Sequence, residues 1–405
     1  MSVAKEQREK LIWEFPNIGK KAPEQEEKAF AYCEGYKEFL NAAKTEREFV
    51  REAVLRLKEA GYEEFEEGKI YQPGDKVYQI NRKKALLMST FGKRPLEDGV
   101  RINVAHIDSP RLDLKPNPLY EKAEAAHFKT HYYGGIKGEE LNIIVGSLPY
   151  PCEEEDSIKE PVKLLALSLL NERFGMTEKD FLRAEIEFVP AVKATDVGLD
   201  RSLVGAYGQD DKVCAYTALT AEMKAKSPEY TTVTILADKE EIGSVGNTGL
   251  NSDFTLHYIE GLCKAGNVDV RKVLRHSLCL SADVNAAYDP TFASVFEEKN
   301  SCYLNKGVVL TKYTGARGKS GSNDASAETM AKVIQIMDEA GVYWQIGELG
   351  AVDVGGGGTV ALFVAGMDVD VVDMGVPILS MHAPFELASK LDIYNTYLAF
   401  AAFCS

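Results

Sequence analysis

The stretch Thr231-Thr232-Val233-Thr234-Ile235-Leu236-Ala237-Asp238-Lys239-Glu240-Glu241-Ile242-Gly243 joins an apolar run to a cluster of charged residues. The run at 231–236 is short and rich in β-branched residues, which is typical of a buried strand. Glu240 and Glu241 come where this strand ends, and neighbouring side chains leave a strand on opposite faces. One glutamate can therefore bind a metal ion while the other faces a reacting water, although a solvated acidic turn is the simpler interpretation of this motif alone.

Strand and helix patterns alternate along the chain on both sides of this stretch. Strands are expected at residues 84–91, 100–108, 231–236, 277–283 and 360–364, and helices at 23–44, 212–226 and 325–340. A further helix is expected after the capping box Thr45-Glu46-Arg47-Glu48, with Gly61 just past its end. The alternation predicts an α/β domain with a mostly parallel or mixed sheet.

Residues 110–195 differ from the rest of the chain. They hold several prolines, the pair Gly134-Gly135 and the acidic run Glu153-Glu154-Glu155-Asp156. We therefore expect a second domain inserted into the first, which leaves residues 1–109 and 196–405 to form one discontinuous domain.

The composition argues against several classes of protein. Hydrophobic residues make up 45% of the chain and charged residues 27%, as in ordinary globular proteins. The net charge of -15 repels phosphate backbones, so nucleic acid is not an expected partner. We expect no membrane association, because no run of about 18 apolar residues occurs. The charged N-terminus and the seven scattered cysteines without a Cys-x-x-Cys pair predict a cytoplasmic protein with reduced thiols.

Two further motifs could carry chemistry. In His106-Ile107-Asp108, at the end of an expected strand, His106 and Asp108 point the same way, and a carboxylate can orient a metal-binding histidine. An ordinary hydrogen bond of a strand-end histidine is the simpler interpretation. Asp210, in Gln209-Asp210-Asp211, precedes an expected helix. It could bridge two cations, or it could simply cap the helix.

Asp283 ends another apolar strand, and His382 follows the apolar residues 376–379. Each is unremarkable alone, but the motifs together place two histidines and several carboxylates at the strand ends where α/β sheets build their sites. Such a set without cysteine suits paired zinc, manganese or cobalt ions. A second glutamate beside a ligand glutamate supplies a general base for water. The residues alone thus favour a two-metal hydrolase.

The order of these motifs resembles the M18 family of metalloaminopeptidases, which includes aspartyl aminopeptidase and the yeast vacuolar aminopeptidase, and the match is close to the bacterial members. The resemblance rests on His106-Ile107-Asp108-Ser109-Pro110, Asp210-Asp211, Asp238-Lys239-Glu240-Glu241-Ile242-Gly243-Ser244, Ser281-Ala282-Asp283, Met381-His382 and the flanking Thr130-His131-Tyr132-Tyr133-Gly134-Gly135-Ile136-Lys137. It implies an α/β fold: a mixed-sheet dinuclear metallopeptidase domain (1–109 and 196–405) with an inserted β-rich dimerisation domain (110–195).

The resemblance also implies roles for individual residues. The implied metal ligands are His106, Asp283, Glu241, His382 and Asp210. The first two would bind one zinc ion, the next two would bind the other, and Asp210 would bridge them. Glu240 would be the general base and Asp108 would orient His106. In the wider clan of this fold the peptide bond after the bridging aspartate is often cis.

The implied activity is removal of single residues from the N-termini of peptides, with a metal-bound hydroxide as nucleophile and Glu240 accepting its proton. The resemblance further implies a homo-oligomer, a dodecamer built from dimers. Another two-metal amidohydrolase on the same fold, such as a deacylase or dipeptidase, is the alternative enzyme. A scaffolding assembly that kept the fold is a third interpretation, but such an assembly has no use for Glu240.

Two features depart from the family pattern. Several dozen residues expected after Lys137 are absent, because Gly138-Glu139-Glu140 follows at once. Relatives that prefer acidic N-terminal residues carry a lysine shortly after a Lys-Gly pair. Strict spacing from Lys306-Gly307 puts Thr311 in that place, and a shift of one residue puts Lys312 there. Lys312 is therefore the candidate substrate-binding residue, with a solvated strand-end lysine as the simpler alternative.

Overall fold

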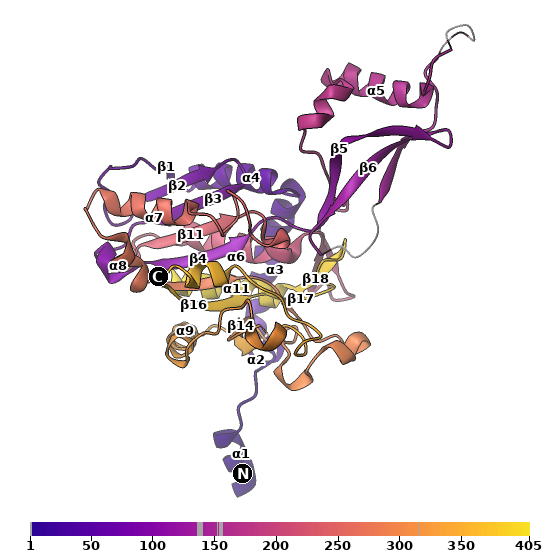
Figure 1. Cartoon of the computed structure of the whole chain (residues 1–405). Helices are drawn as coiled ribbons and strands as arrows, with labels where there is room; N and C mark the ends of the chain where they lie inside the picture. The colour runs from indigo at the N-terminus through magenta and orange to yellow at the C-terminus, as the bar shows by residue number, and fades with distance from the viewer. Residues whose placement is uncertain (1, 136–140, 152, 154–156, 315) are drawn as a thin grey trace. The chain divides into compact units, whose positions relative to one another are not determined.

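A nine-stranded mixed sheet forms the centre of the larger of two compact units (Figure 1). The computed structural model describes residues 2–135, 141–151, 153, 157–314 and 316–405. The larger unit comprises Met1–Asp108 and Val192–Ser405, and the smaller unit is Ser109–Ala191.

The central sheet brings the expected strands together. Its order is β1 (Glu63–Glu64), β2 (Lys76–Asn81), β3 (Ala85–Thr90), β11 (Thr232–Ala237), β4 (Arg101–His106), β12 (Leu278–Ala282), β16 (Asp370–Gly375), β14 (Val308–Thr311) and β15 (Trp344–Ile346). Strand β4 pairs in parallel with β11 on one side and with β12 on the other, whereas β3 and β14 pair antiparallel to their neighbours β11 and β16. The carboxyl ends of β11, β4 and β12 therefore meet at one edge.

Helices cover both faces of this sheet, and the strands are buried on both sides as their continuous apolar runs require. One core contains Leu236 and the helices α3 (Glu26–Ala42), α4 (Glu46–Glu59), α6 (Gln209–Lys224), α9 (Ala327–Glu339) and α11 (Lys390–Phe403). The other contains Ile235 and the helices α7 (Phe254–Lys264), α8 (Val270–Arg275) and α10 (Ala361–Ala365). Among the described residues of the larger unit, the other α-helices are α1 (Val3–Leu11) and α2 (Ile18–Lys21).

Helix α4 begins and ends where short sequence motifs at its two ends predict. Thr45 Oγ1 accepts a hydrogen bond from the Glu48 N–H at 3.3 Å, and Glu48 Oε2 accepts one from the Thr45 N–H at 3.1 Å. Gly61, just past the helix, has a φ of 84°, a conformation that glycine adopts without strain. The predicted capping box and terminal glycine are confirmed.

The strand predicted at 360–364 was wrong. These residues start helix α10, which turns one face with Val360, Ala361 and Val364 into the core. A short apolar run has no periodicity that separates a buried strand from a buried helix. The strand of this region is β16, which begins at Asp370.

A second sheet completes the larger unit. It has the order β13 (Asn285–Ala286), β17 (Pro377–Leu379), β18 (Glu386–Ser389), β10 (Leu203–Ala206) and β9 (Thr195–Val197). None of its strands exceeds four residues, and β18 lies between β17 and β10, antiparallel to both.

The smaller unit is an antiparallel sheet with the order β7 (Asn142–Gly146), β6 (Ala125–Tyr133), β5 (Arg111–Lys122) and β8 (Glu187–Phe188). Helix α5 (Pro161–Phe174) packs on it through Val162, in a small core with Leu119, Phe128 and Phe181. The predicted departure at Lys137 and most of the acidic run at 153–156 lie outside the described residues. Among the described residues, none of the helices has both the length and the apolar character needed to cross a bilayer.

Candidate metal centre

His106 and Asp108 lie at the carboxyl end of β4 and are both buried. His106 Nδ1 lies 3.2 Å from the main-chain oxygen of Asp108 and 3.4 Å from its Oδ1. The other ring nitrogen, Nε2, lies 3.2 Å from Asp210 Oδ1 and 3.6 Å from Asp283 Oδ1. His106 thus presents one nitrogen to a cluster of carboxylates while Asp108 holds the other.

Glu240 and Glu241 follow β11 in a short 3-10 helix, Glu240–Ile242, and not in the strand itself. Their side chains diverge, as predicted, because consecutive residues of a 3-10 helix are about a third of a turn apart. The predicted cause, alternation along a strand, was wrong. The Asp108 carboxylate accepts both of their N–H groups, each at 3.2 Å. The Glu240 side chain is 19% exposed and that of Glu241 only 3%.

Asp210 and His382 complete the cluster from the other sheet. Asp210 lies at the start of α6, directly after β10, and His382 follows β17. Asp210 Oδ2 lies 3.0 Å from His382 Nε2, which is also 3.5 Å from Glu241 Oε2. Asp210 therefore faces both histidines, whereas simple capping of the helix would need its side chain at the N–H groups of α6. The peptide bond between Asp210 and Asp211 is cis, as the resemblance implied.

The structure brings the seven residues predicted as metal ligands, general base and orienting carboxylate into one cluster. Potential ligand atoms of His106, Glu240 and Asp283 lie within 4.8 Å of one another, as do those of His106, Asp210 and Glu241. Glu241 Oε1 is buried and has no hydrogen-bond partner in the part of the chain that the structure describes. Oxygen and imidazole donors at this spacing suit divalent zinc, manganese or cobalt.

The electrostatics of the cluster favour added positive charge. Burial, together with neighbouring carboxylates, raises the pKa of Glu240 and of Glu241. Burial also opposes ionisation of Asp210, but hydrogen bonds from His106 and His382 hold the pKa of Asp210 well below its usual range. Buried like charges this close cannot all ionise unless cations compensate them.

Glu386, the first residue of β18, is a site residue that the sequence analysis missed. Its carboxylate accepts N–H groups of Gln209 at 2.6 Å, Asp210 at 3.1 Å and His382 at 2.8 Å. A lone glutamate in Pro384-Phe385-Glu386 carries no motif. Its position four residues after His382 was the available signal.

Lys312, the candidate substrate-binding residue, follows β14 and is engaged elsewhere. Its Nζ donates to Asp324 Oδ1 and to the Ala325 carbonyl, both at 2.7 Å. Thr311, the alternative at this place, is buried and accepts a hydrogen bond from Asn285 Nδ2 at 2.9 Å. Asn285 follows shortly after Asp283, so Thr311 is linked to the segment that enters the cluster.

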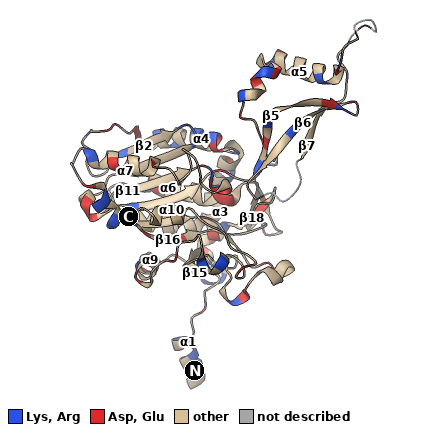
Figure 2. Cartoon of the chain, viewed as in Figure 1, with Lys and Arg blue, Asp and Glu red and all other residues tan. Residues whose placement is uncertain are grey.

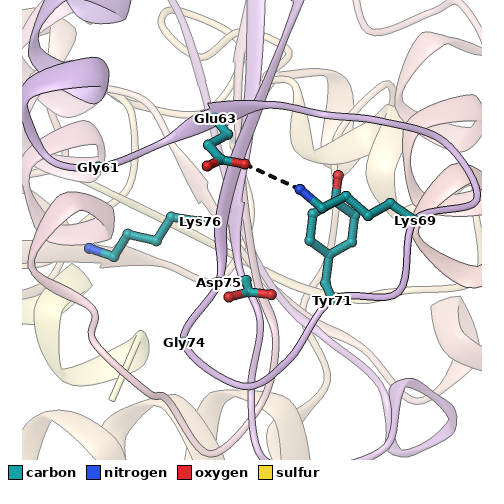
Figure 3. A pocket seen from close by; sticks show the side chains of 7 residues that line it. All are labelled: Gly61, Glu63, Lys69, Tyr71, Gly74, Asp75 and Lys76. Atoms are coloured by element: carbon teal, nitrogen blue, oxygen red, sulfur yellow. Dashed lines mark hydrogen bonds and ion pairs between the residues drawn. The ribbon is translucent and has the colours of Figure 1, made fainter.

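A separate polar pocket of about 300 Å³ lies beside β1 and β2, lined by Gly61, Glu63, Lys69, Tyr71, Gly74, Asp75 and Lys76 (Figure 3). Its charged groups have partners: Glu63 pairs with Lys69 at 3.2 Å, Lys76 Nζ donates to the Met223 carbonyl at 2.9 Å, and Asp75 Oδ2 accepts the Gln72 N–H at 2.7 Å. It contains none of the predicted site residues.

Comparisons with known proteins agree with the geometry. A family model described as aminopeptidase I zinc metalloprotease (M18) matches residues 39–144 and 137–404. A probable M18 family aminopeptidase 1 of Clostridium acetobutylicum is 42% identical over 463 positions, which cover 97% of this chain and 98% of the relative. Because those positions outnumber the 405 residues of this chain, the relative contains residues that this chain lacks.

Solved structures give the same result. An M18-family aminopeptidase from Thermotoga maritima is 40% identical with a TM-score of 0.90, covering 97% of this chain and 100% of that one. A structure described as the S. cerevisiae mApe1 dodecamer is 20% identical with a TM-score of 0.73, covering 91% and 95%. At that identity the likeness concerns the fold alone.

Proposed function

Because this chain belongs to the M18 family of aminopeptidases and is a peptide hydrolase, we propose that it removes N-terminal residues from peptides with two divalent metal ions and Glu240 as general base. The observation that carries the proposal is Asp210, whose two carboxylate oxygens face different histidines, His106 at 3.2 Å and His382 at 3.0 Å. A carboxylate in that position can serve two ions at once.

The other proposed ligands form two pairs, one on each side of Asp210. His106 and Asp283 would hold one ion, since His106 Nε2 lies 3.6 Å from Asp283 Oδ1. Glu241 and His382 would hold the other, since Glu241 Oε2 lies 3.5 Å from His382 Nε2. When bound, such a pair of cations supplies Lewis-acid activation of water and of the scissile carbonyl. Zinc is the proposed metal, and manganese and cobalt accept the same donors.

Glu240 and Asp108 act on protons and orientation. The Glu240 side chain is more exposed than that of Glu241, at 19% against 3%, so Glu240 can reach a water molecule and the leaving amine. It would take the proton of the attacking water and deliver it to that amine. Asp108 fixes the ring of His106 and, through the N–H groups of Glu240 and Glu241, the turn that carries both glutamates.

The proposed substrates are peptides with a free N-terminal amine and, preferentially, a neutral first residue. The ammonium of Lys312 already pairs with Asp324 at 2.7 Å, so a substrate carboxylate would have to compete for it. Both side chains are about two-fifths exposed, at 41% and 44%, and exposed pairs of this kind are typically worth less than about 1 kcal/mol. An acidic residue would thus be tolerated without being required.

We propose a homo-oligomer, a dodecamer built from dimers, with the smaller unit as the dimerisation domain. That unit exposes large apolar side chains, including Ile144 at 68%, Leu148 at 71% and Phe174 at 69%. Strand β7 is the edge of its sheet and leaves backbone groups available for pairing. Apolar residues that lie exposed in one contiguous patch commonly mark protein contacts, and the proposal takes these residues as part of such a patch.

Two further expectations belong to this proposal. The cysteines at 33, 214, 263, 279, 302 and 404 are buried and free, as a reducing cytoplasm allows. Basic and acidic residues alternate along the ribbons of both units (Figure 2), and the net charge of the chain is -15. Nucleic acid is therefore not a proposed partner.

The test is metal removal combined with a substrate panel. A chelator should abolish hydrolysis of peptides with a free N-terminus, and added zinc, manganese or cobalt should restore it. Peptides with an acylated N-terminus serve as the matched substrates and should not be cleaved. Full activity after complete metal removal would contradict the metal mechanism, and faster cleavage of the acylated peptides would point to a deacylase.

A further inference from the structure

We propose that Glu386 is a positioning residue that fixes Asp210 and His382 relative to each other and thereby sets the metal affinity of the centre. The inference rests on the proposed function, because it takes Asp210 and His382 as metal ligands. It concerns a residue that binds no metal itself.

The carboxylate of Glu386 joins two segments that carry ligands. Oε2 accepts the N–H groups of Gln209 and Asp210, at 2.6 and 3.1 Å, at the start of α6. Oε1 accepts the N–H of His382, at 2.8 Å, in the loop after β17. Each oxygen thus serves a different segment, and the carboxylate acts as a clamp between them.

The position of Glu386 in its sheet makes this clamp rigid. It starts β18, which lies between β17, the strand before His382, and β10, the strand before Asp210. The main-chain oxygen of Glu386 accepts a hydrogen bond from the side-chain Nε2 of Gln209 at 2.7 Å. Gln209 is therefore held by two atoms of Glu386, this oxygen and Oε2. Glu386 is 1% exposed, so water does not weaken these hydrogen bonds.

The His382 backbone needs such support. Its φ is 65°, in the left-handed region that residues other than glycine rarely adopt and that the surrounding structure must hold. The N–H bond to Glu386 fixes the backbone at that residue. The imidazole of His382 is 36% exposed, so its ring has less packing to hold it than the buried His106 has.

A carboxylate performs this task better than an amide. Both Glu386 oxygens face N–H donors, and glutamine offers one oxygen and one NH2 group. In Glu386→Gln, one segment would therefore meet a donor instead of an acceptor and move away. Losing an outer partner of metal ligands typically costs 10–100-fold in metal affinity.

The experiment measures zinc binding to metal-free full-length protein, by competition with a chromophoric chelator, for the wild type, Glu386→Gln and Asp392→Asn. Asp392 is the matched control, because it is also a buried carboxylate, and it accepts the N–H groups of Asn305 at 2.7 Å and Gly307 at 2.8 Å. Glu386→Gln should bind zinc about 10–100-fold more weakly. Asp392→Asn should lower the thermal midpoint and leave zinc affinity within about threefold of wild type. At saturating zinc, Glu386→Gln should keep its KM.

Two results would overturn the inference alone: Glu386→Gln binds zinc as tightly as wild type, or Asp392→Asn loses as much affinity as Glu386→Gln. A wild-type chain that binds no zinc, manganese or cobalt would overturn the proposed function and the inference with it. If Glu386→Gln does not fold, Glu386→Asp decides, since it keeps the charge but draws the carboxylate back by one methylene. It should show an intermediate affinity, and unchanged affinity would overturn the inference.

Discussion

The two halves of the candidate metal centre come from different sheets, and in both a buried carboxylate accepts backbone N–H groups. In the first half, three adjacent parallel strands of the central sheet place the residues: His106 ends β4, Asp283 follows β12, and the glutamate pair follows β11. Asp108 accepts the N–H groups of both glutamates. Asp210 and His382 follow short strands of the second sheet, and Glu386 accepts their N–H groups.

Each half thus combines proposed metal ligands with a buried carboxylate, Asp108 or Glu386, that accepts backbone N–H groups. In each half, the carboxylate holds the backbone of segments that carry proposed ligands, and the side chains of those residues point into the cluster. The halves differ in how the strands place them. Parallel strands of five or six residues carry the first half. Strands of three or four residues carry the second half, where Glu386 is the proposed clamp.

The largest expected effect comes from breaking the link between the halves. Asp210→Asn removes the charge that faces both histidines, so the pair of ions should no longer be held and kcat/KM should fall roughly 10³-fold or more. Metal analysis beside the rate measures it. Two fully retained metal ions in this variant would contradict the bridging role.

The next test separates the neighbouring glutamates of the first half. Glu240→Gln keeps its shape but accepts no proton, so kcat should fall about 10²–10⁴-fold with little change in KM and with both metals retained. Glu241→Gln, the matched variant, should lose metal as well as activity. If Glu240→Gln loses metal while Glu241→Gln keeps it, the two roles are exchanged.

Asp108→Asn tests whether both halves use the same device. The amide keeps one acceptor for the N–H groups of Glu240 and Glu241 and loses the negative charge beside His106, so metal affinity or activity should fall about 10–100-fold. The loss should match that of Glu386→Gln within an order of magnitude. A variant with wild-type affinity and rate would show that the first half needs no such support.

Lys312→Ala probes a residue outside both halves. It should leave the rate on leucine-terminated peptides nearly unchanged and reduce the rate on aspartate-terminated peptides only slightly, because Lys312 is paired with Asp324. Comparing the two rates gives the answer. A collapse confined to the aspartate substrate would identify Lys312 as the determinant of an acidic preference.

The smallest expected effect is on the stability of the fold and comes from Asp392, the carboxylate used as the control above. Burial raises the pKa of Asp392 to about 7, against backbone hydrogen bonds that lower it. Between about pH 4 and 7 the folded chain holds a proton here that the unfolded chain has lost, so the free energy of unfolding falls as the pH rises through this window. Each pKa unit corresponds to about 1.4 kcal/mol, which limits the change to a few kcal/mol.

Asp392→Asn should therefore show a shallower pH dependence of the unfolding free energy than wild type, with lower stability overall. Denaturant titrations of metal-loaded protein from pH 4 to 8 measure it. A slope equal to that of wild type would mean that Asp392 does not titrate in this range.

The sequence could predict the first half of the centre almost completely. Apolar strands of five or six residues lead to His106, Asp283 and the glutamate pair, and parallel pairing brings the carboxyl ends of these strands to one edge. The helix ends at Thr45 and Gly61 were equally readable, because capping depends on residues a few positions apart. Even here, Glu240 and Glu241 lie in a 3-10 helix and not at a strand end as predicted. A 3-10 helix of three residues is too short to show a recognisable sequence pattern.

By itself, the sequence determined the residue types of the centre, the family, and the helices and strands long enough to show a period. Only the tertiary structure decided that residues 361–365 form a helix, that Lys312 pairs with Asp324, and that Glu386 accepts N–H groups of Gln209 and His382. These features depend on partners that packing brings together, such as Gln209 and Glu386, which lie 177 positions apart. Backbone N–H groups are present at every residue except proline, so the pattern of side chains cannot reveal which of them a buried carboxylate will bind.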